Sequence, residues 1–135
     1  MNPIWIASFP RSGNTFFRTI LWNCFRLRSG SVYPDDLGDT PTIDGVVGHV
    51  ELSQGETFAA GDLALVKTHN APPEKVDKTI YIVRDGREAV TSTWHFYNQK
   101  IAMKDIIEGH HRFSTWANHI NAWGPLQRPN TLLVR

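Results

Sequence analysis

The sequence has little cysteine, little net charge and no long apolar run. Its one cysteine, Cys24, excludes an intramolecular disulfide and a cysteine-cluster metal site. Its 14 lysines and arginines nearly balance 13 aspartates and glutamates, so the net charge of +1 gives no reason to expect nucleic acid or a charged membrane surface as a partner. No apolar run approaches the roughly 20 residues of a membrane-spanning helix, and the first residues lack the basic and apolar regions of a signal peptide. We therefore expect a cytoplasmic protein without an integral membrane segment.

The composition is that of a globular protein. Hydrophobic residues make up 41% and charged residues 20% of the 135 residues, which suits one compact domain with its own core. One segment stands apart, because residues 30–62 hold seven acidic residues and no lysine or arginine. Its many glycines and prolines predict an acidic, mostly irregular insertion, with at most one short element near Val46–Leu52. It is either a solvated excursion or a lid or acceptor-binding loop.

Short apolar runs alternate with segments of helical periodicity. Four runs are apolar without alternation, as expected of strands buried on both faces in a parallel sheet: Ile4–Ala7, Leu63–Val66, Thr79–Val83 and Thr131–Val134. Apolar residues recur at helical spacing over three segments, Phe17–Leu27, Val90–Ile101 and Phe113–Trp123. Asp85 and Glu88 form a capping-box pattern before the second, and Gly124 ends the third. The prediction is an α/β fold, an open parallel sheet flanked by helices.

Cationic residues follow three of the predicted strands. Arg11 follows the first, Lys67 and His69 follow the second, and Arg84 follows the third. In open parallel sheets ligands bind beyond the carboxyl ends of the strands, so these side chains are expected at one edge. Three strands that deliver cations to one rim indicate an anionic ligand.

The loop after the first strand suits a phosphate or sulfate. Ser12 and Gly13 allow backbone N–H groups to turn inward, the next helix offers its free N–H groups, and Arg11 can hold two oxygens at once. Thr15 can add a hydroxyl. The loop lacks the G-x-x-x-x-G-K-[ST] pattern of nucleoside-triphosphate sites. The plainer alternative is a capped helix start with an exposed arginine.

His69 is a candidate general base, because its ordinary pKa lies near neutral pH. Lys67, two residues earlier in an extended segment, points to the same side and can neutralise charge on a bridging oxygen. The alternative is a structural or surface histidine. The pair His110-His111 has no cysteine or carboxylate cluster to suggest a metal in the sequence, and no metal is expected.

Three segments, in order, resemble the sulfotransferases that use 3′-phosphoadenosine 5′-phosphosulfate (PAPS). Residues 9–16, Phe-Pro-Arg-Ser-Gly-Asn-Thr-Phe, look like the family's P-K-S-G-T-T-W loop for the 5′-phosphosulfate. Lys67-Thr68-His69 matches its K-T-H element, which bears the catalytic base. Residues 81–96 are similar to its 3′-phosphate segment, where an arginine and a serine eight positions later hold the phosphate. The resemblance implies a P-loop-like sulfotransferase fold for the single domain 1–135.

The resemblance also implies roles for individual residues. The phosphosulfate would be held by Arg11, Ser12, Gly13, Asn14 and Thr15. Phe16 stands where the family has the tryptophan that stacks on adenine. Arg84 and Ser92 would bind the 3′-phosphate, although Ser92 alone would pass for an ordinary helix-surface serine. His69 would remove the proton of an alcohol or amine acceptor, and Lys67 would assist the transfer.

Two departures from the family matter. Arg11 replaces the usual lysine and keeps the charge, but its pKa above about 12 prevents it from donating a proton to the leaving phosphate. The chain also stops on a predicted strand, before the family's later glycine- and basic-rich segment, so we expect an N-terminal fragment. The alternatives are a non-catalytic nucleotide- or phosphate-binding module and, disfavoured by the missing G-K-[ST], a small P-loop kinase. The acceptor, a small molecule or a glycan, and the oligomeric state are not specified by the sequence.

Overall fold

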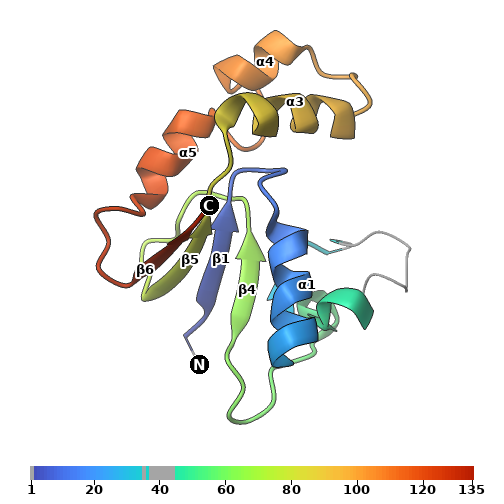
Figure 1. The fold of residues 1–135 in the computed structure, drawn as a ribbon, viewed down its shortest axis with the longest axis vertical. Coiled ribbons are helices and arrows are strands. Elements are labelled where there is room, and N and C mark those ends of the chain that lie inside the picture. Colours follow the sequence, from blue (N-terminus) through green and yellow to red (C-terminus); the bar gives the residue numbers. More distant parts are fainter. Residues whose placement is uncertain (1, 35, 37–44) are drawn as a thin grey trace.

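A six-stranded, fully parallel sheet organises the protein. The computed structural model describes residues 2–34, 36 and 45–135. The strands lie in the order β3-β2-β4-β1-β5-β6, and each neighbouring pair is parallel (Figure 1). Their bounds are β1 Ile4–Ser8, β2 Ser29–Ser31, β3 His49–Val50, β4 Leu65–Thr68, β5 Lys78–Ile82 and β6 Thr131–Val134. The predicted fold class and its four strands are confirmed, but β4 lies two residues later than predicted, so Lys67 belongs to the strand itself.

The helices surround the sheet and one pair lies beyond its carboxyl edge. The helices are α1 Asn14–Phe25, the 3-10 turn η1 Leu52–Gln54, α3 Gly86–Phe96, α4 Met103–Glu108 and α5 Trp116–Trp123, and the described residues 45–47 are helical as well. Figure 1 shows α3 and α4 above the arrowheads of β1 and β4, so they roof the edge where ligands of parallel sheets bind. Among the described residues, no helix is long and apolar enough to span a membrane.

Two helices have other bounds than the apolar periodicity predicted. The predicted helix through Ile101 ends at Phe96, because Asn98 and Gln99 adopt left-handed backbone with φ of 51° and 59°. Asp85 caps α3 as predicted and accepts from the Arg87 N–H at 2.9 Å. The second contact of the predicted capping box, from the Asp85 N–H to the Glu88 carboxylate, is wrong. That carboxylate accepts from Arg84 Nε at 3.0 Å instead. The third predicted helix starts at Trp116 rather than Phe113, and the six-residue α4 was not predicted.

Each face of the sheet is buried by its own apolar cluster. On the α1 face, Ile6 packs with Leu21 and Leu65. On the opposite face, Ala7 of the same strand packs with Tyr81 and with Trp123 of α5. Successive strand residues point to opposite faces, so a run that is apolar at every position is what a sheet covered on both sides requires.

The acidic insertion contributes more regular structure than predicted. It supplies the end of β2, and β3 lies within the predicted short element near Val46–Leu52. Strand β2 is Ser-Gly-Ser, a pattern with no apolar signal, and it forms because β4 and β3 pair with it on either side. Residues 35 and 37–44 of the insertion lie outside the described part of the chain.

Candidate functional site

The structure brings the predicted cations of the first and third strands into contact. Arg84 Nη1 donates to the carbonyl oxygen of Arg11 at 3.1 Å, although 73 residues separate them in the chain. Arg11 Nε donates to Ser92 Oγ at 3.3 Å, so the serine on α3 faces the loop after β1. The Arg11 guanidinium also lies over the Phe96 ring, 5.1 Å from its centre. The residues that follow β1 and β5 therefore form one rim with residues of α3.

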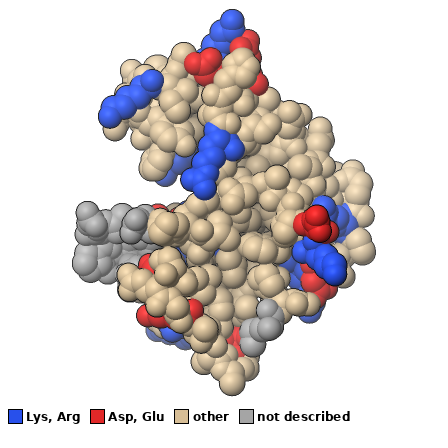
Figure 2. Space-filling view, turned by 180° about the vertical axis from the view of Figure 1, so that it is seen from behind, with Lys and Arg blue, Asp and Glu red and all other residues tan. Residues whose placement is uncertain are grey.

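A cavity of about 500 Å³ opens at this rim. Its lining includes Arg11, Tyr33, Asp36, Lys67, His69, Arg84 and Arg112. Figure 2, from behind, shows the molecule hollowed below the lobe that carries α3 and α4, with lysine and arginine atoms on the upper side of the hollow. The predicted base and the predicted anion-binding cations thus line one space.

The loop between β1 and α1 has the features of an anion site. Gly13 is the N-cap of α1 with φ of 99°, a conformation that favours glycine, and no side chain in the described part of the chain caps the first N–H groups of the helix. The Ser12 hydroxyl is buried without a hydrogen-bond partner among the described residues. A buried hydroxyl beside uncapped N–H groups is satisfied by a bound oxyanion, so the residues present fit the phosphosulfate that the resemblance implied.

The other loop residues divide between support and exposure. Asn14 is buried, and its side-chain amide donates to the Ile6 carbonyl at 3.1 Å and to Ser8 Oγ at 3.3 Å. Its side-chain NH2 group therefore fastens the loop to β1, while its Oδ1 is buried without a hydrogen-bond partner among the described residues. Thr15 is exposed, and the ring of Phe16 is 71% exposed.

His69 is held with one ring nitrogen committed. Its Nδ1 lies 2.7 Å from the carbonyl oxygen of Ser8, and a carbonyl oxygen only accepts, so Nδ1 carries the proton. The neutral ring therefore keeps its lone pair on Nε2. Burial, and secondly the charge of Lys67, lower the pKa of His69 to about 4. A neutral imidazole with a fixed tautomer is the form that can accept a proton at neutral pH.

Aromatic neighbours that the sequence did not single out hold His69 in place. The Tyr33 ring stacks on the imidazole with 5.9 Å between centres, and its hydroxyl accepts from the His69 N–H at 2.7 Å. Behind them, Tyr81 donates to Nδ1 of His119 at 2.7 Å, and His119 Nε2 donates to the His69 carbonyl at 3.0 Å. These contacts join residues 33, 69, 81 and 119, a combination with no local sequence signal.

Lys67 is buried and already has a charged partner. Its ammonium lies 2.5 Å from Asp36, whose other carboxylate oxygen accepts from Arg18 Nη1 at 2.7 Å. Burial lowers the pKa of Lys67 although Asp36 opposes it. Burial would raise the pKa of Asp36, but Lys67 and Arg18 hold it below its ordinary value. The sequence analysis did not single out Arg18. Its place between Phe17 and Leu21, on the apolar face of the first predicted helix, was the signal that it is buried.

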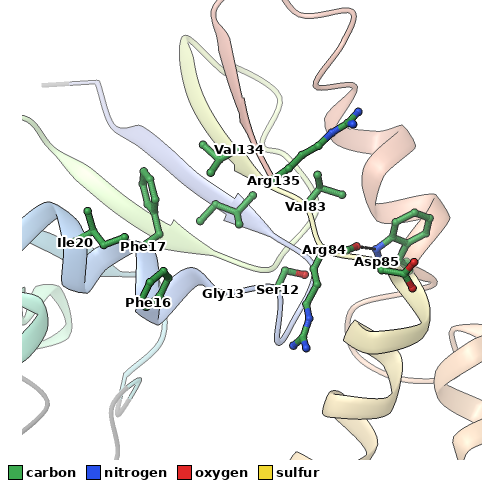
Figure 3. Close-up of a pocket in the computed structure, with 12 residues that line it drawn as sticks. Ser12, Gly13, Phe16, Phe17, Ile20, Val83, Arg84, Asp85, Val134 and Arg135 are labelled. Carbon is green, nitrogen blue, oxygen red and sulfur yellow. Dashed lines mark hydrogen bonds between the residues drawn. The ribbon is translucent and has the colours of Figure 1, made fainter.

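A second cavity, of about 800 Å³, adjoins the loop on the side of α1 (Figure 3). Its lining includes Phe16, Phe17, Ile20, Val83 and Val134, so its wall is largely apolar. Ser12 and Arg84 line it as well, which joins the apolar space to the anion-binding rim. Trp116 Nε1 donates to the Arg84 carbonyl at 3.1 Å and fixes the backbone there. An apolar slot beside an anion site suits a planar base attached to phosphates.

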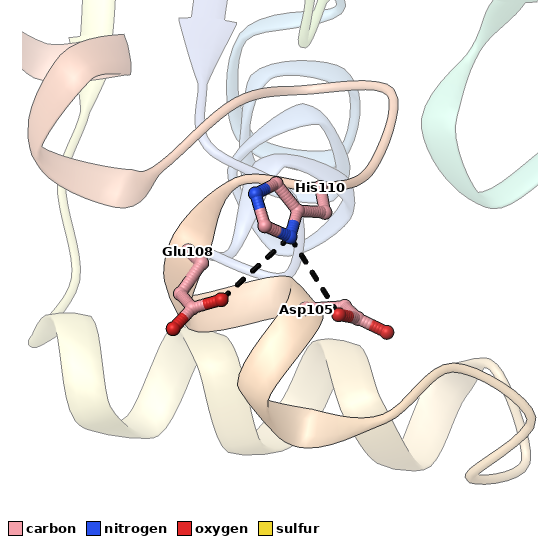
Figure 4. A group of neighbouring side chains, drawn as sticks. All are labelled: Asp105, Glu108 and His110. Carbon is pink, nitrogen blue, oxygen red and sulfur yellow. Dashed lines mark ion pairs between the residues drawn. The ribbon is translucent and has the colours of Figure 1, made fainter.

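One group of metal-ligand types lies on α4 and the turn after it. His110 Nδ1 lies 3.7 Å from Asp105 and 3.6 Å from Glu108 (Figure 4). Glu108 and His110 are exposed, and ordinary ion pairing accounts for the group.

Comparison with known proteins agrees with the motifs. No curated protein sequence matches the chain closely enough to be compared with it. The family model described as "Sulfotransferase domain" matches residues 1–134, nearly the whole chain. The chain therefore belongs to the sulfotransferase domain family.

Proposed function

We propose that the protein transfers a sulfuryl group from PAPS to the hydroxyl or amine of an acceptor. Family membership supports sulfuryl transfer in general. The observation that carries the choice of donor is the hydrogen-bonded chain from Arg84 to Arg11 to Ser92 around the loop with the unpartnered Ser12. This chain offers two anion-binding positions, and PAPS carries one anionic group on each side of its ribose.

The residues present divide between the parts of the donor. Arg11, Ser12 and the first N–H groups of α1 bind the 5′-phosphosulfate. Arg84 and Ser92 bind the 3′-phosphate. Phe16 lies at the cavity of Figure 3 with its ring exposed, and it stacks on the adenine.

His69 and Lys67 act on the acceptor side. Nε2 of His69 takes the acceptor's proton while the acceptor oxygen or nitrogen forms its bond to sulfur, and the bond between sulfur and the bridging phosphate oxygen breaks. Adenosine 3′,5′-bisphosphate is the leaving group. Lys67 and Arg11 stabilise the charge that develops on the bridging oxygen, and Arg11 does so without giving up a proton.

Nucleotide binding tests the donor site. Adenosine 3′,5′-bisphosphate is expected to raise the melting temperature, and adenosine 5′-monophosphate, which lacks the 3′-phosphate, to raise it less. Arg84→Ala removes a charge-assisted contact and weakens binding by about 10- to 100-fold. Arg87→Ala, three residues later in the first turn of α3 and with a side chain that is 92% exposed, is the matched control and keeps the shift. Folded protein that shows no shift at millimolar nucleotide contradicts the proposal.

Product formation separates an enzyme from a non-catalytic binding module. The protein is incubated with sulfur-labelled PAPS and a panel of phenol and sugar acceptors, and sulfated product is detected by mass. His69→Ala is expected to abolish the product while the nucleotide-induced shift persists, because His69 lies on the acceptor side. Product that survives this substitution excludes His69 as the base.

A further inference from the structure

Arg112, in the segment between α4 and α5, lies on the wall of the cavity that holds His69. Its guanidinium lies over two rings, 5.1 Å from the centre of Tyr33 and 5.3 Å from that of Phe113. The same two rings flank the imidazole, since His69 stacks on Tyr33 and meets Phe113 edge-on at 5.8 Å. The cation and the base are therefore fixed by shared neighbours.

The charged side chains described around the cavity leave Arg112 without an acidic counterpart among them. Four cations line it, Arg11, Lys67, Arg84 and Arg112, against the single acid Asp36 among the described residues. Asp36 is engaged by Lys67 and by the buried Arg18. Within the described part of the chain, no carboxylate lies within ion-pair distance of Arg112.

Arg112 is separate from the donor site of the proposed function. Arg11 and Arg84 are hydrogen-bonded to the rim formed by the loop after β1 and by α3. Arg112 instead lies with Tyr33 and His69, where the acceptor's reacting group must come. A positive charge fixed on ring faces at that position favours an acceptor that brings a negative charge of its own.

We propose that the acceptor is an anionic hydroxyl compound, a ring that carries a carboxylate, and that Arg112 binds this carboxylate while His69 faces the hydroxyl. The proposal rests on the proposed sulfuryl transfer. A planar guanidinium matches a carboxylate with two parallel hydrogen bonds. Arg112 lies over the rings of Tyr33 and Phe113, and two more aromatic residues, Phe96 and Tyr97, line the same cavity, which suits a flat ring. Arg112 is then a residue that determines acceptor specificity.

Calorimetric binding in the presence of adenosine 3′,5′-bisphosphate tests the proposal without turnover. The first pair of probes is 4-hydroxybenzoate and its neutral isostere 4-hydroxybenzamide, and the second pair is glucuronate and glucose. The carboxylate member of at least one pair is expected to bind about tenfold more tightly or better, and the pair that responds tells an aromatic acceptor from a sugar. Equal binding within both pairs, or no binding by either carboxylate, overturns the proposal.

Two variants assign the preference to its residue. Arg112→Gln is expected to remove the preference for the carboxylate and leave the binding of the neutral probes unchanged. Arg26→Gln is the matched control, because Arg26 is also an exposed arginine over a ring, 5.4 Å from the centre of Trp22, and lies away from the cavity. A preference that survives Arg112→Gln overturns the assignment. If the proposed donor site is wrong, adenosine 3′,5′-bisphosphate fails to raise the melting temperature. That result is separate from the comparison between the acceptor probes and does not alter it.

Discussion

The carboxylate of Asp36 holds the ammonium of Lys67 at 2.5 Å on the wall of the candidate acceptor cavity. Asp36 comes from the acidic insertion and Lys67 from the central strand β4, so the insertion reaches the site through this pair. Arg18, a fully buried residue of α1, binds the other oxygen of the same carboxylate. Asp36 therefore holds the Lys67 ammonium in place and also neutralises the buried charge of Arg18.

Removing Asp36 should destabilise the protein strongly. Asp36→Ala leaves two buried cations facing each other, and breaking a buried pair in this way costs about 3 kcal/mol or more of unfolding free energy. The matched control is Glu56→Ala, because Glu56 pairs with Arg28 at 3.7 Å where both side chains are about half exposed. An exposed pair contributes less than about 1 kcal/mol. Urea unfolding measures both, and equal losses would show that Asp36 has no special part in the fold.

Gly86 controls the position of Arg84 through Trp116. A Cβ at Gly86 would lie 2.8 Å from the Trp116 ring, whose N–H holds the Arg84 carbonyl. Gly86→Ala should therefore shift the ring, cost about 1–3 kcal/mol of stability and weaken the binding of adenosine 3′,5′-bisphosphate. Gly45→Ala, at a position with open space around it, is the control. If Gly86→Ala binds the nucleotide as tightly as the parent, Trp116 does not position Arg84.

The sequence predicted the parts of this site that depend on parallel strands. Arg11, His69 and Arg84 follow strands whose direction was predictable from unbroken apolar runs, and a parallel sheet brings such residues to one edge whatever the loops do. The supporting residues were not predictable in the same way. Tyr33 and Asp36 come from a segment without periodicity, and their contacts with His69 and Lys67 depend on the path of that segment over the sheet.

The end of α3 and the strand β2 were also not predictable from apolar periodicity. The end of α3 is set by left-handed residues at Asn98 and Gln99, which no apolar period records. Strand β2 forms from Ser-Gly-Ser because its neighbours supply the hydrogen bonds, so only the assembled sheet shows it. Arg112 was missed for a further reason, since its place over Tyr33 joins two segments that are 79 positions apart in the sequence.

Phe16 offers a test of the nucleotide's base. Its ring is 71% exposed, so Phe16→Ala should leave unfolding unchanged and weaken nucleotide binding by roughly tenfold, the order of one lost stacking contact. Phe16→Trp enlarges the stacking face and should tighten binding. Phe25→Ala is the control, because this ring is 64% exposed on the same helix and lines neither cavity of the site. Calorimetry with adenosine 3′,5′-bisphosphate measures all three, and equal affinities would place the base elsewhere.

His69, which is half-buried, and the buried His119 should give the protein a distinct response to acid. The pKa of His69 and that of His119 are both lowered to about 4, first by burial, from an ordinary value of about 6.5. His69 is therefore unprotonated at neutral pH, and the acid limb of kcat/KM is expected near pH 4 instead of 6.5. A limb near 6.5 would mean that the proton acceptor is a solvent-exposed group.

The lowered pKa values of His69 and His119 also make the free energy of unfolding depend on pH. Between about pH 6.5 and pH 4 the unfolded chain binds protons at these histidines and the folded chain does not, so stability falls as the pH drops through this window. Each histidine contributes a slope of up to about 1.4 kcal/mol per pH unit. His119→Asn removes one of these groups and should lower the slope by the contribution of one proton relative to the parent protein. Urea unfolding of both proteins across this pH range measures the difference, and identical slopes would show that His119 titrates as it does in the unfolded chain.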